Sequence, residues 1–140
     1  MSVSNFSDVR VLFADTDAMG VVYHTNYVKW FELGRNAFMR QLGVPYSELI
    51  KLKLNLPLIK VSCEYLKFAT YDQRLIVETK FAYIKKASVK FNSKIWDEHK
   101  ENLLAEGYTI HVCTNHEGKI RRIPQLLLEL IDKYNISKGE

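Results

Sequence analysis

The strongest constraint on the fold comes from four alternating runs of apolar and polar residues in the second half of the chain. They cover about residues 58–68, 74–83, 88–96 and 103–114. A period of two is typical of half-buried β-strands. The polar breaks at 70–73, 85–87 and 97–101 are short, whereas a parallel crossover needs about a dozen residues or more. We therefore expect antiparallel hairpins and an antiparallel sheet.

Residues 27–42 instead have the period of a helix. Its apolar side is wide and comprises Tyr27, Trp30, Phe31, Gly34, Phe38 and Leu42, against a polar stripe of Lys29, Glu32, Asn36 and Arg40. A helix of this kind needs cover over most of its circumference, which a curved sheet supplies. Thr25 or Asn26 is the expected N-cap, and Gly43 followed by Pro45 is expected to end the helix.

The remaining segments complete an α+β plan. Residues 6–13 are expected to form a strand, because Val9, Val11 and Phe13 alternate with polar residues. A loop follows at 14–20, a short helix at 47–52, and a Leu-rich terminal helix after Pro124. The 140 residues suit a single domain spanning 1–140, with a curved antiparallel sheet wrapped around one long central helix.

Charge and composition exclude several function classes. The net charge of +4 suits an anionic partner, but the basic residues are scattered and form no dense nucleic-acid-binding run. The sequence contains no membrane-spanning apolar stretch and no basic start followed by an apolar run, so we expect a cytoplasmic protein. Cys63 and Cys113 lack metal-ligand spacing. They are expected to be reduced and structural, although two strand cysteines can also pair.

The segment 13–28 contains the richest chemistry, because it joins two carboxylates, a glycine turn and a helix start. A carboxylate near a helix N-terminus lies in the positive end of the dipole, and the free amides there can bind an oxyanion. Asp15 and Asp17 could alternatively bond only loop amides. A phosphatase of the haloacid-dehalogenase type is disfavoured by Met19 and by the lack of a parallel doubly wound domain. A paired-carboxylate glycosidase is disfavoured because the chain is too short to form a cleft.

These residues carry a family resemblance. The stretch from Val9 to Tyr27, with Asp17, Gly20 and His24 at its centre, followed by Trp30-Phe31-Glu32 and Arg35, resembles the 4-hydroxybenzoyl-CoA thioesterases and the YbgC-like acyl-CoA thioesterases. Tyr65-Leu66-Lys67 resembles a further segment of that family, and the order of elements matches its hotdog fold. The resemblance implies hydrolysis of an acyl-CoA thioester to a free carboxylic acid and coenzyme A.

The resemblance also implies catalytic roles for two residues. Asp17 matches the family's catalytic carboxylate, which acts as nucleophile on the thioester carbonyl or as general base for water. The backbone amide of His24 falls where the family polarises that carbonyl. The His24 side chain matches a histidine that positions the substrate or moves a proton, although a histidine at a helix start can equally be a cap or a core residue.

Candidate substrate-binding residues are Tyr23, Asn26 and Tyr27 near the helix start, and Lys67, Lys85 and Lys86 for the phosphates of coenzyme A. The lysines could instead be solvated turn residues. Tyr23, Tyr27 and Trp30 are candidates for the acyl pocket, although Trp30 also suits the core. No metal or redox cofactor is implied, because coenzyme A is part of the substrate.

The resemblance further implies a homodimer or homotetramer in which the sheets join and the site forms at the interface. Two other function classes stay open: a hotdog module that binds acyl-CoA or acyl carrier protein without turnover, and a hotdog dehydratase or isomerase. Glu32 has no evident partner histidine for the latter. Phe13 and Ala14 stand where YbgC-like members often have Tyr and an acidic residue, so assignment to the short-chain YbgC branch stays open. The acyl group is undetermined, because the depth of the pocket depends on the tertiary structure.

Overall fold

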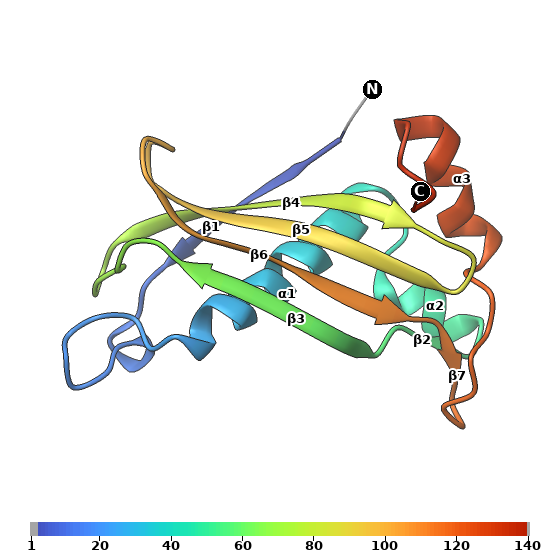
Figure 1. Cartoon of the computed structure of the whole chain (residues 1–140), viewed down its shortest axis with the longest axis horizontal. Coiled ribbons are helices and arrows are strands. Elements are labelled where there is room, and N and C mark those ends of the chain that lie inside the picture. The colour runs from blue at the N-terminus through green and yellow to red at the C-terminus, as the bar shows by residue number, and fades with distance from the viewer. Residues whose placement is uncertain (1–2, 140) are drawn as a thin grey trace.

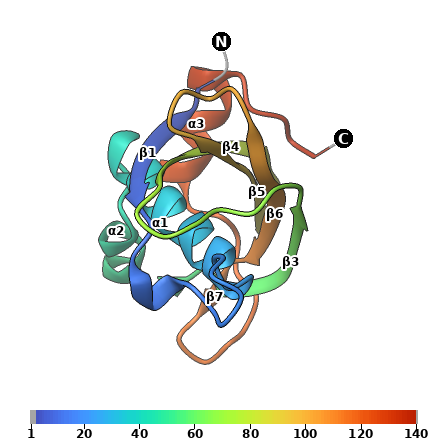
Figure 2. The same ribbon diagram turned by 90° about the vertical axis from the view of Figure 1, so that its left-hand side faces the viewer.

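The computed structural model describes residues 3–139. Five antiparallel strands form one sheet in the order β1-β4-β5-β6-β3 (Figure 1). Their bounds are β1 Asn5–Arg10, β3 Leu58–Tyr65, β4 Arg74–Ile84, β5 Ser88–Asp97 and β6 Leu103–Val112. The sheet curls around helix α1, Thr25–Gln41, as the end-on view shows (Figure 2). This arrangement confirms the expected hotdog fold.

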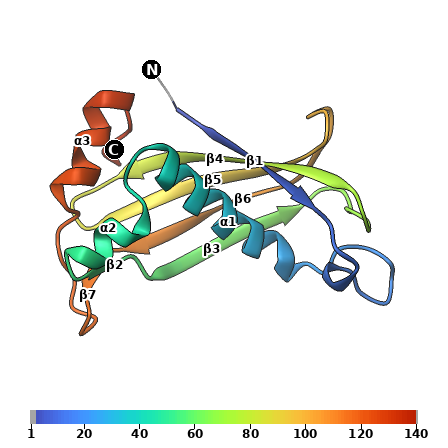
Figure 3. The same cartoon turned by 180° about the vertical axis from the view of Figure 1, so that it is seen from behind.

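Helix α1 lies against the concave face of the sheet, as the rear view shows (Figure 3), and its apolar side faces the strands. Its buried residues are Tyr27, Trp30, Phe31, Gly34, Phe38 and Met39, nearly the set expected from the sequence. They meet inward-facing residues of β4 and β5 such as Val77 and Ile95. The outer face of α1 carries the polar stripe and stays open to solvent, so the sheet covers the helix on one side only.

The connection between β3 and β4 differs from the prediction. We expected a hairpin across residues 70–73, but β3 pairs with β6 at the opposite side of the sheet from β1. The reason is that β1 pairs with β4 and β5 occupies the other side of β4, which leaves no edge of β4 for β3. The other two breaks do form hairpins, β4 with β5 and β5 with β6.

The start of the chain also corrects two expectations. β1 ends at Arg10, and Phe13 lies in a 3₁₀ turn, Phe13–Asp15, with 76% of its surface exposed rather than on the buried face of a strand. Neither Thr25 nor Asn26 caps α1. The N-cap is His24, whose side chain makes no capping hydrogen bond. Asn26 instead uses its side chain to hold the preceding loop.

Smaller elements close the other end of the sheet. Helix α2, Tyr46–Lys51, follows Gly43, whose φ of +78° ends α1 in the expected way. The two-residue strands β2, Leu54–Asn55, and β7, Thr114–Asn115, pair with each other, and α3, Gln125–Tyr134, packs its leucines on a second core cluster. Within residues 3–139, no helix is long and apolar enough to cross a membrane.

Candidate active site

The loop between β1 and α1 forms a tight antiparallel turn. The amide of Asp17 donates to the carbonyl of Val21 at 3.0 Å, and the amide of Tyr23 donates to the carbonyl of Asp15 at 2.8 Å. Gly20 closes the turn at φ +79°, a conformation that disfavours residues with a Cβ. The turn runs directly into α1 and so holds Asp17 and His24 in one short, hydrogen-bonded unit.

The two carboxylates of this loop have different surroundings. Asp15 is 5% exposed, accepts a hydrogen bond from the amide of Leu12 and forms an ion pair with Lys29 at 2.9 Å. Asp17 is half-buried, and its Oδ1 accepts a hydrogen bond from the amide of Met19 at 2.8 Å. Its Oδ2 has no partner in the part of the chain that the structure describes. Asp15 therefore holds the loop, and Asp17 has an oxygen available for chemistry.

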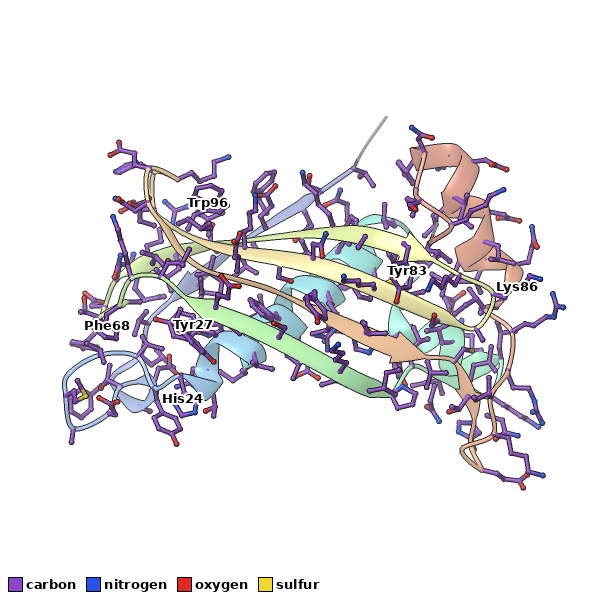
Figure 4. All side chains as sticks on the ribbon, in the orientation of Figure 1. His24, Tyr27, Phe68, Tyr83, Lys86 and Trp96 are labelled. Carbon is purple, nitrogen blue, oxygen red and sulfur yellow. The ribbon has the colours of Figure 1, made fainter. Side chains whose placement is uncertain are left out.

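The N-terminus of α1 offers a free donor beside this loop. His24 takes helical dihedrals of −55° and −34° as the N-cap, and among residues 3–139 its amide donates no hydrogen bond. A helix N-terminus has unpaired amides and the positive end of the dipole, which together attract an oxygen that gains negative charge. The His24 imidazole is exposed and lies against the ring of Tyr23, with ring centroids 4.5 Å apart. Figure 4 shows it at the same end of the molecule as Phe68.

Tyr65, on the edge strand β3, is a site residue that the catalytic prediction missed. Its hydroxyl donates to the carbonyl of His24 at 3.2 Å, and its ring lies edge-on to Tyr27 with centroids 5.3 Å apart. Burial raises the pKa of Tyr65 to about 12, with the neighbouring Cys63 thiol adding to the shift, so the hydroxyl stays a donor. The alternation in 58–68 places Cys63 and Tyr65 on one face of the strand, but nothing in that pattern identified the contact with His24.

The three predicted binding residues near the helix start have different settings. Tyr23 is 46% exposed and its ring faces solvent at the mouth of the loop. Asn26 donates from its side-chain amide to the carbonyl of Asp15 at 2.8 Å, which fixes the loop. Tyr27 is 2% exposed, and its hydroxyl accepts a hydrogen bond from the amide of Ala69. Trp30 lies in the core at 3% exposure.

The three predicted lysines lie at two ends of the sheet. Lys67 follows β3 at the same end as His24, and its ammonium donates to the side chain of Asn102 at 2.7 Å. Lys85 and Lys86 occupy the turn between β4 and β5 at the far end of the sheet (Figures 1 and 4). The eleven residues of β4 span about 36 Å, so one chain does not bring these two lysines to its own His24.

A cavity of about 760 Å³ runs along one side of α1. Its walls come from α1, from the segment around α2 and from strands β3, β5 and β6. The lining residues are Val28, Lys29, Glu32, Arg35, Asn36, Met39, Arg40, Pro45, Tyr46, Ser47, Leu56, Leu58, Phe91 and His111. A space of this size is in the range of ligand pockets, and its walls combine apolar side chains with the polar stripe of α1. Val28 is one helical turn from His24, so the cavity begins beside the helix start.

Side chains that could bind a metal ion do not cluster in the described part of the chain. No three His, Cys, Asp or Glu side chains among residues 3–139 converge as a metal site would require. Cys63 and Cys113 are free thiols, and burial raises the pKa of both. The chemically available groups of the site are the Asp17 carboxylate and the His24 amide, and the hydroxyl of Tyr65 is engaged with the His24 carbonyl.

Comparison with known proteins gives consistent matches. The sequence profile of the thioesterase-like superfamily matches residues 11–131. The acyl-CoA thioesterase YbgC of Haemophilus influenzae is 30% identical over 116 residues, which are 82% of this chain and 83% of that protein. A crystal structure of an Aquifex aeolicus protein aligns with a TM-score of 0.84 at 32% identity and covers 90% of this chain and 98% of the other. A gentisyl-coenzyme A thioesterase aligns with a TM-score of 0.81 at 27% identity, covering 89% and 99%.

Proposed function

The chain belongs to the thioesterase-like superfamily, and we propose on that premise that it hydrolyses an acyl-CoA thioester to a carboxylic acid and coenzyme A. Water is the second substrate. The proposal is supported by the relatives that carry the name acyl-CoA thioesterase and match most of this chain. It is supported independently by a loop that presents an unengaged carboxylate oxygen and a free helix amide together.

Asp17 is the catalytic carboxylate of the proposed reaction. As a nucleophile, its Oδ2 attacks the thioester carbonyl, the C–S bond breaks to release coenzyme A as a thiolate that takes a proton, and water then hydrolyses the acyl anhydride. As a general base, Asp17 removes a proton from water, and the resulting hydroxide attacks the carbonyl directly. In both routes the carbonyl oxygen gains negative charge next to the amide of His24 and the dipole of α1.

The contrast between Asp15 and Asp17 is the observation that carries this assignment. A carboxylate that is buried, paired with Lys29 and bonded to the amide of Leu12 has no oxygen left for a substrate. Asp17, two residues later, uses one oxygen to hold the turn and keeps the other available. The His24 amide at the start of α1 completes the pair of groups that thioester hydrolysis requires.

We further propose that two or four copies of the chain assemble and that β3 is the joining edge. Its outward edge has no strand neighbour in the described residues, and its side chains Ile59, Val61 and Tyr65 are 61%, 42% and 45% exposed. An exposed apolar edge strand favours pairing with another strand. Two-fold antiparallel pairing would bring the end of one chain that carries Lys85 and Lys86 toward the Asp17 end of the other, where they could bind the phosphates of coenzyme A.

The reaction as written consumes only acyl-CoA and water, so we expect activity to survive treatment with a metal chelator. Acyl carrier protein is an alternative carrier of the same thioester. A cytoplasmic location is supported by the free thiols of Cys63 and Cys113, because thiols stay reduced in that compartment.

Release of free thiol from a panel of short, long and aromatic acyl-CoAs tests the function. We expect turnover of at least one member by the wild type and a decrease of about 10²-fold or more for Asp17→Asn. Asp132→Asn, an exposed aspartate on α3, is the matched control and should retain wild-type activity. Folded wild-type protein that binds acyl-CoA but turns over no member would favour a binding module instead.

Single-turnover hydrolysis in ¹⁸O water tests whether Asp17 acts as nucleophile or as general base. On the nucleophile route, water attacks an acyl anhydride, and label can enter the protein carboxylate. On the general-base route, label enters only the released acid. Label found by mass spectrometry in the peptide that contains Asp17 identifies the nucleophile route.

A further inference from the structure

Arg35 is a half-buried cation without a partner. It lies on α1 and lines the 760 Å³ cavity, and within residues 3–139 its guanidinium makes no hydrogen bond and no ion pair. Burial lowers the pKa of Arg35, and the Glu32 carboxylate one turn earlier partly offsets this without reaching ion-pair distance. A guanidinium in this setting has lost part of its hydration and has gained no acceptor in exchange.

The neighbouring histidine does not supply the missing acceptor. His111 is 4% exposed, its Nδ1 lies 2.9 Å from the carbonyl of Leu56, and its Nε2 lies 3.0 Å from the hydroxyl of Thr109. A neutral imidazole with a proton on Nδ1 satisfies both contacts, since Nε2 then accepts from Thr109. Burial lowers the pKa of His111 to about 4, with Arg35 adding a small contribution, so the ring is neutral near pH 7. Both ring nitrogens are therefore occupied.

The cavity extends along α1 from Val28, one turn after His24, past Arg35. His24, Val28, Arg35 and Met39 are spaced four, seven and four residues apart, which places them on the same side of α1. Arg35 lies eleven positions after His24, or about 16 Å along the axis, and its side chain leans back toward the helix N-terminus. The cavity wall includes the apolar side chains of Val28, which lies one turn after His24, and of Leu56 and Leu58, which lie beside His111.

We propose that this cavity holds the acyl group and that Arg35 selects acyl chains with a carboxylate at the end distant from the thioester. This inference rests on the proposed thioesterase function and names its substrate class. The thioester carbonyl lies at the His24 amide, the acyl chain runs past Val28 into the cavity, and the distal carboxylate forms a two-pronged hydrogen bond with the guanidinium. A chain of about ten carbons spans the separation.

Matched pairs of substrates test the selection. The pair consists of decanoyl-CoA and the monothioester of coenzyme A with decanedioic acid, which differ in the distal carboxylate. We expect the wild type to hydrolyse the carboxylated substrate with a kcat/KM about tenfold to a hundredfold higher, the range for a hydrogen bond between charged groups. Arg35→Gln should abolish this preference, and Arg35→Lys should retain part of it because the charge stays and the planar fork is lost.

Arg122→Gln, an exposed arginine at the other end of the sheet, is the matched control and should keep the wild-type preference. Equal kcat/KM values for the two substrates in the wild type would overturn the inference while leaving the thioesterase function intact. A preference that survives Arg35→Gln would also overturn it.

A binding measurement separates this inference from the catalytic one. Dissociation constants of both acyl-CoAs are measured by calorimetry on Asp17→Asn and on the double variant Asp17→Asn, Arg35→Gln. We expect the first variant to bind the carboxylated thioester at least tenfold more tightly and the second to bind both alike. If each variant binds the two acyl-CoAs with equal dissociation constants, the result contradicts the inference. Sedimentation of Arg35→Gln checks the competing explanation, because loss of assembly would mean that Arg35 pairs with a second copy.

Discussion

Asp15 and Asp17 are two positions apart, yet only Asp17 keeps an oxygen free. Asp15 is held by the amide of Leu12 and by Lys29, whereas Asp17 accepts one hydrogen bond at the edge of the turn. The role of Tyr65 likewise depends on the hydrogen bond that its hydroxyl makes. Its hydroxyl donates to the carbonyl of the residue whose amide we assign to the thioester. Tyr65 is thus a positioning residue that fixes the peptide units around His24.

Removing only that hydroxyl tests the positioning role. Tyr65→Phe keeps the ring contact with Tyr27 and loses one hydrogen bond, worth about 1 kcal/mol. We expect kcat to fall about fivefold with KM little changed, because the His24 amide then polarises the carbonyl less effectively. Steady-state kinetics on the best substrate of the panel measure both values. Tyr71→Phe, an exposed tyrosine, is the control. A rise in KM at constant kcat would instead assign Tyr65 to substrate binding.

The buried His111 predicts a pH dependence of stability. Its pKa is lowered from 6.5 to about 4 in the folded protein because burial disfavours the charged ring. Between these values the unfolded chain binds a proton that the folded chain does not, so stability is present above pH 6.5 and falls as the pH drops toward 4. The loss is on the order of 3 kcal/mol for a shift of this size.

Urea unfolding at pH 7, 6, 5 and 4 measures this dependence. We expect His111→Gln to be less stable than wild type at pH 7 but to lose less stability on acidification, because it has no imidazole to protonate. The difference between the two curves isolates His111 from the carboxylates. Parallel curves over this range would contradict the prediction.

At the scale of elements, the position of α1 on the sheet decides where the helix N-terminus points. Gly34 is the point of closest approach: a Cβ there would overlap the hydroxyl of Thr79 and lie 2.9 Å from Cγ1 of Val77. Both neighbours are fully buried on β4 and have no space to move. The small residue lets the helix lie deep in the curved sheet, and it thereby fixes the height of His24 above β3 and Tyr65.

Gly34→Ala should therefore destabilise the protein even though alanine favours helices. Overpacking costs about 1–3 kcal/mol, and the higher helix propensity of alanine offsets about 1 kcal/mol of this. We therefore expect the free energy of unfolding to fall by about 1–2 kcal/mol. Chemical denaturation measures it. Asn36→Ala, on the exposed face of the same helix, isolates the propensity gain and should be neutral or slightly stabilising. A more stable Gly34→Ala protein would mean that the helix can shift without strain.

At the scale of the whole molecule, the sheet is asymmetric in its edges. The β1 side is packed against α1, whereas β3 presents apolar side chains to solvent on the strand that also carries Tyr65. A second copy on this edge would cover those side chains and close the site end of the cavity. Assembly and activity should then be lost together.

A charge on the open edge tests this coupling. Val61→Lys places an ammonium on a half-exposed position of β3, where a partner strand would bury it. We expect sedimentation to show a shift to the monomer and kcat/KM to fall at least tenfold. Ile120→Lys, at a position 65% exposed in the loop after β7, is the control and should change neither. A monomeric Val61→Lys protein with full activity would mean that one chain forms a complete site.

Much of this architecture is determined by local sequence. The period-two runs, the wide apolar side of 27–42 and the Gly43 terminator act over a few residues, so they predicted four strands and a central helix close to their observed bounds. The motif around Asp17 and His24 is equally local, and it identified the loop that the structure forms. The matching profile over residues 11–131 confirms the family that this motif resembles.

Contacts between distant segments were decided only by the tertiary structure. The pairing of β3 with β6 follows from competition for the edges of β4, which no short window of sequence contains. Phe13 is exposed because the chain leaves the sheet at Arg10 to form the site loop. Three further features depend on segments that are tens of residues apart in the sequence: the contact of Tyr65 with His24, the unpaired Arg35 and the far position of Lys85. The packing and hydrogen bonding between such segments cannot be read from any short stretch of sequence.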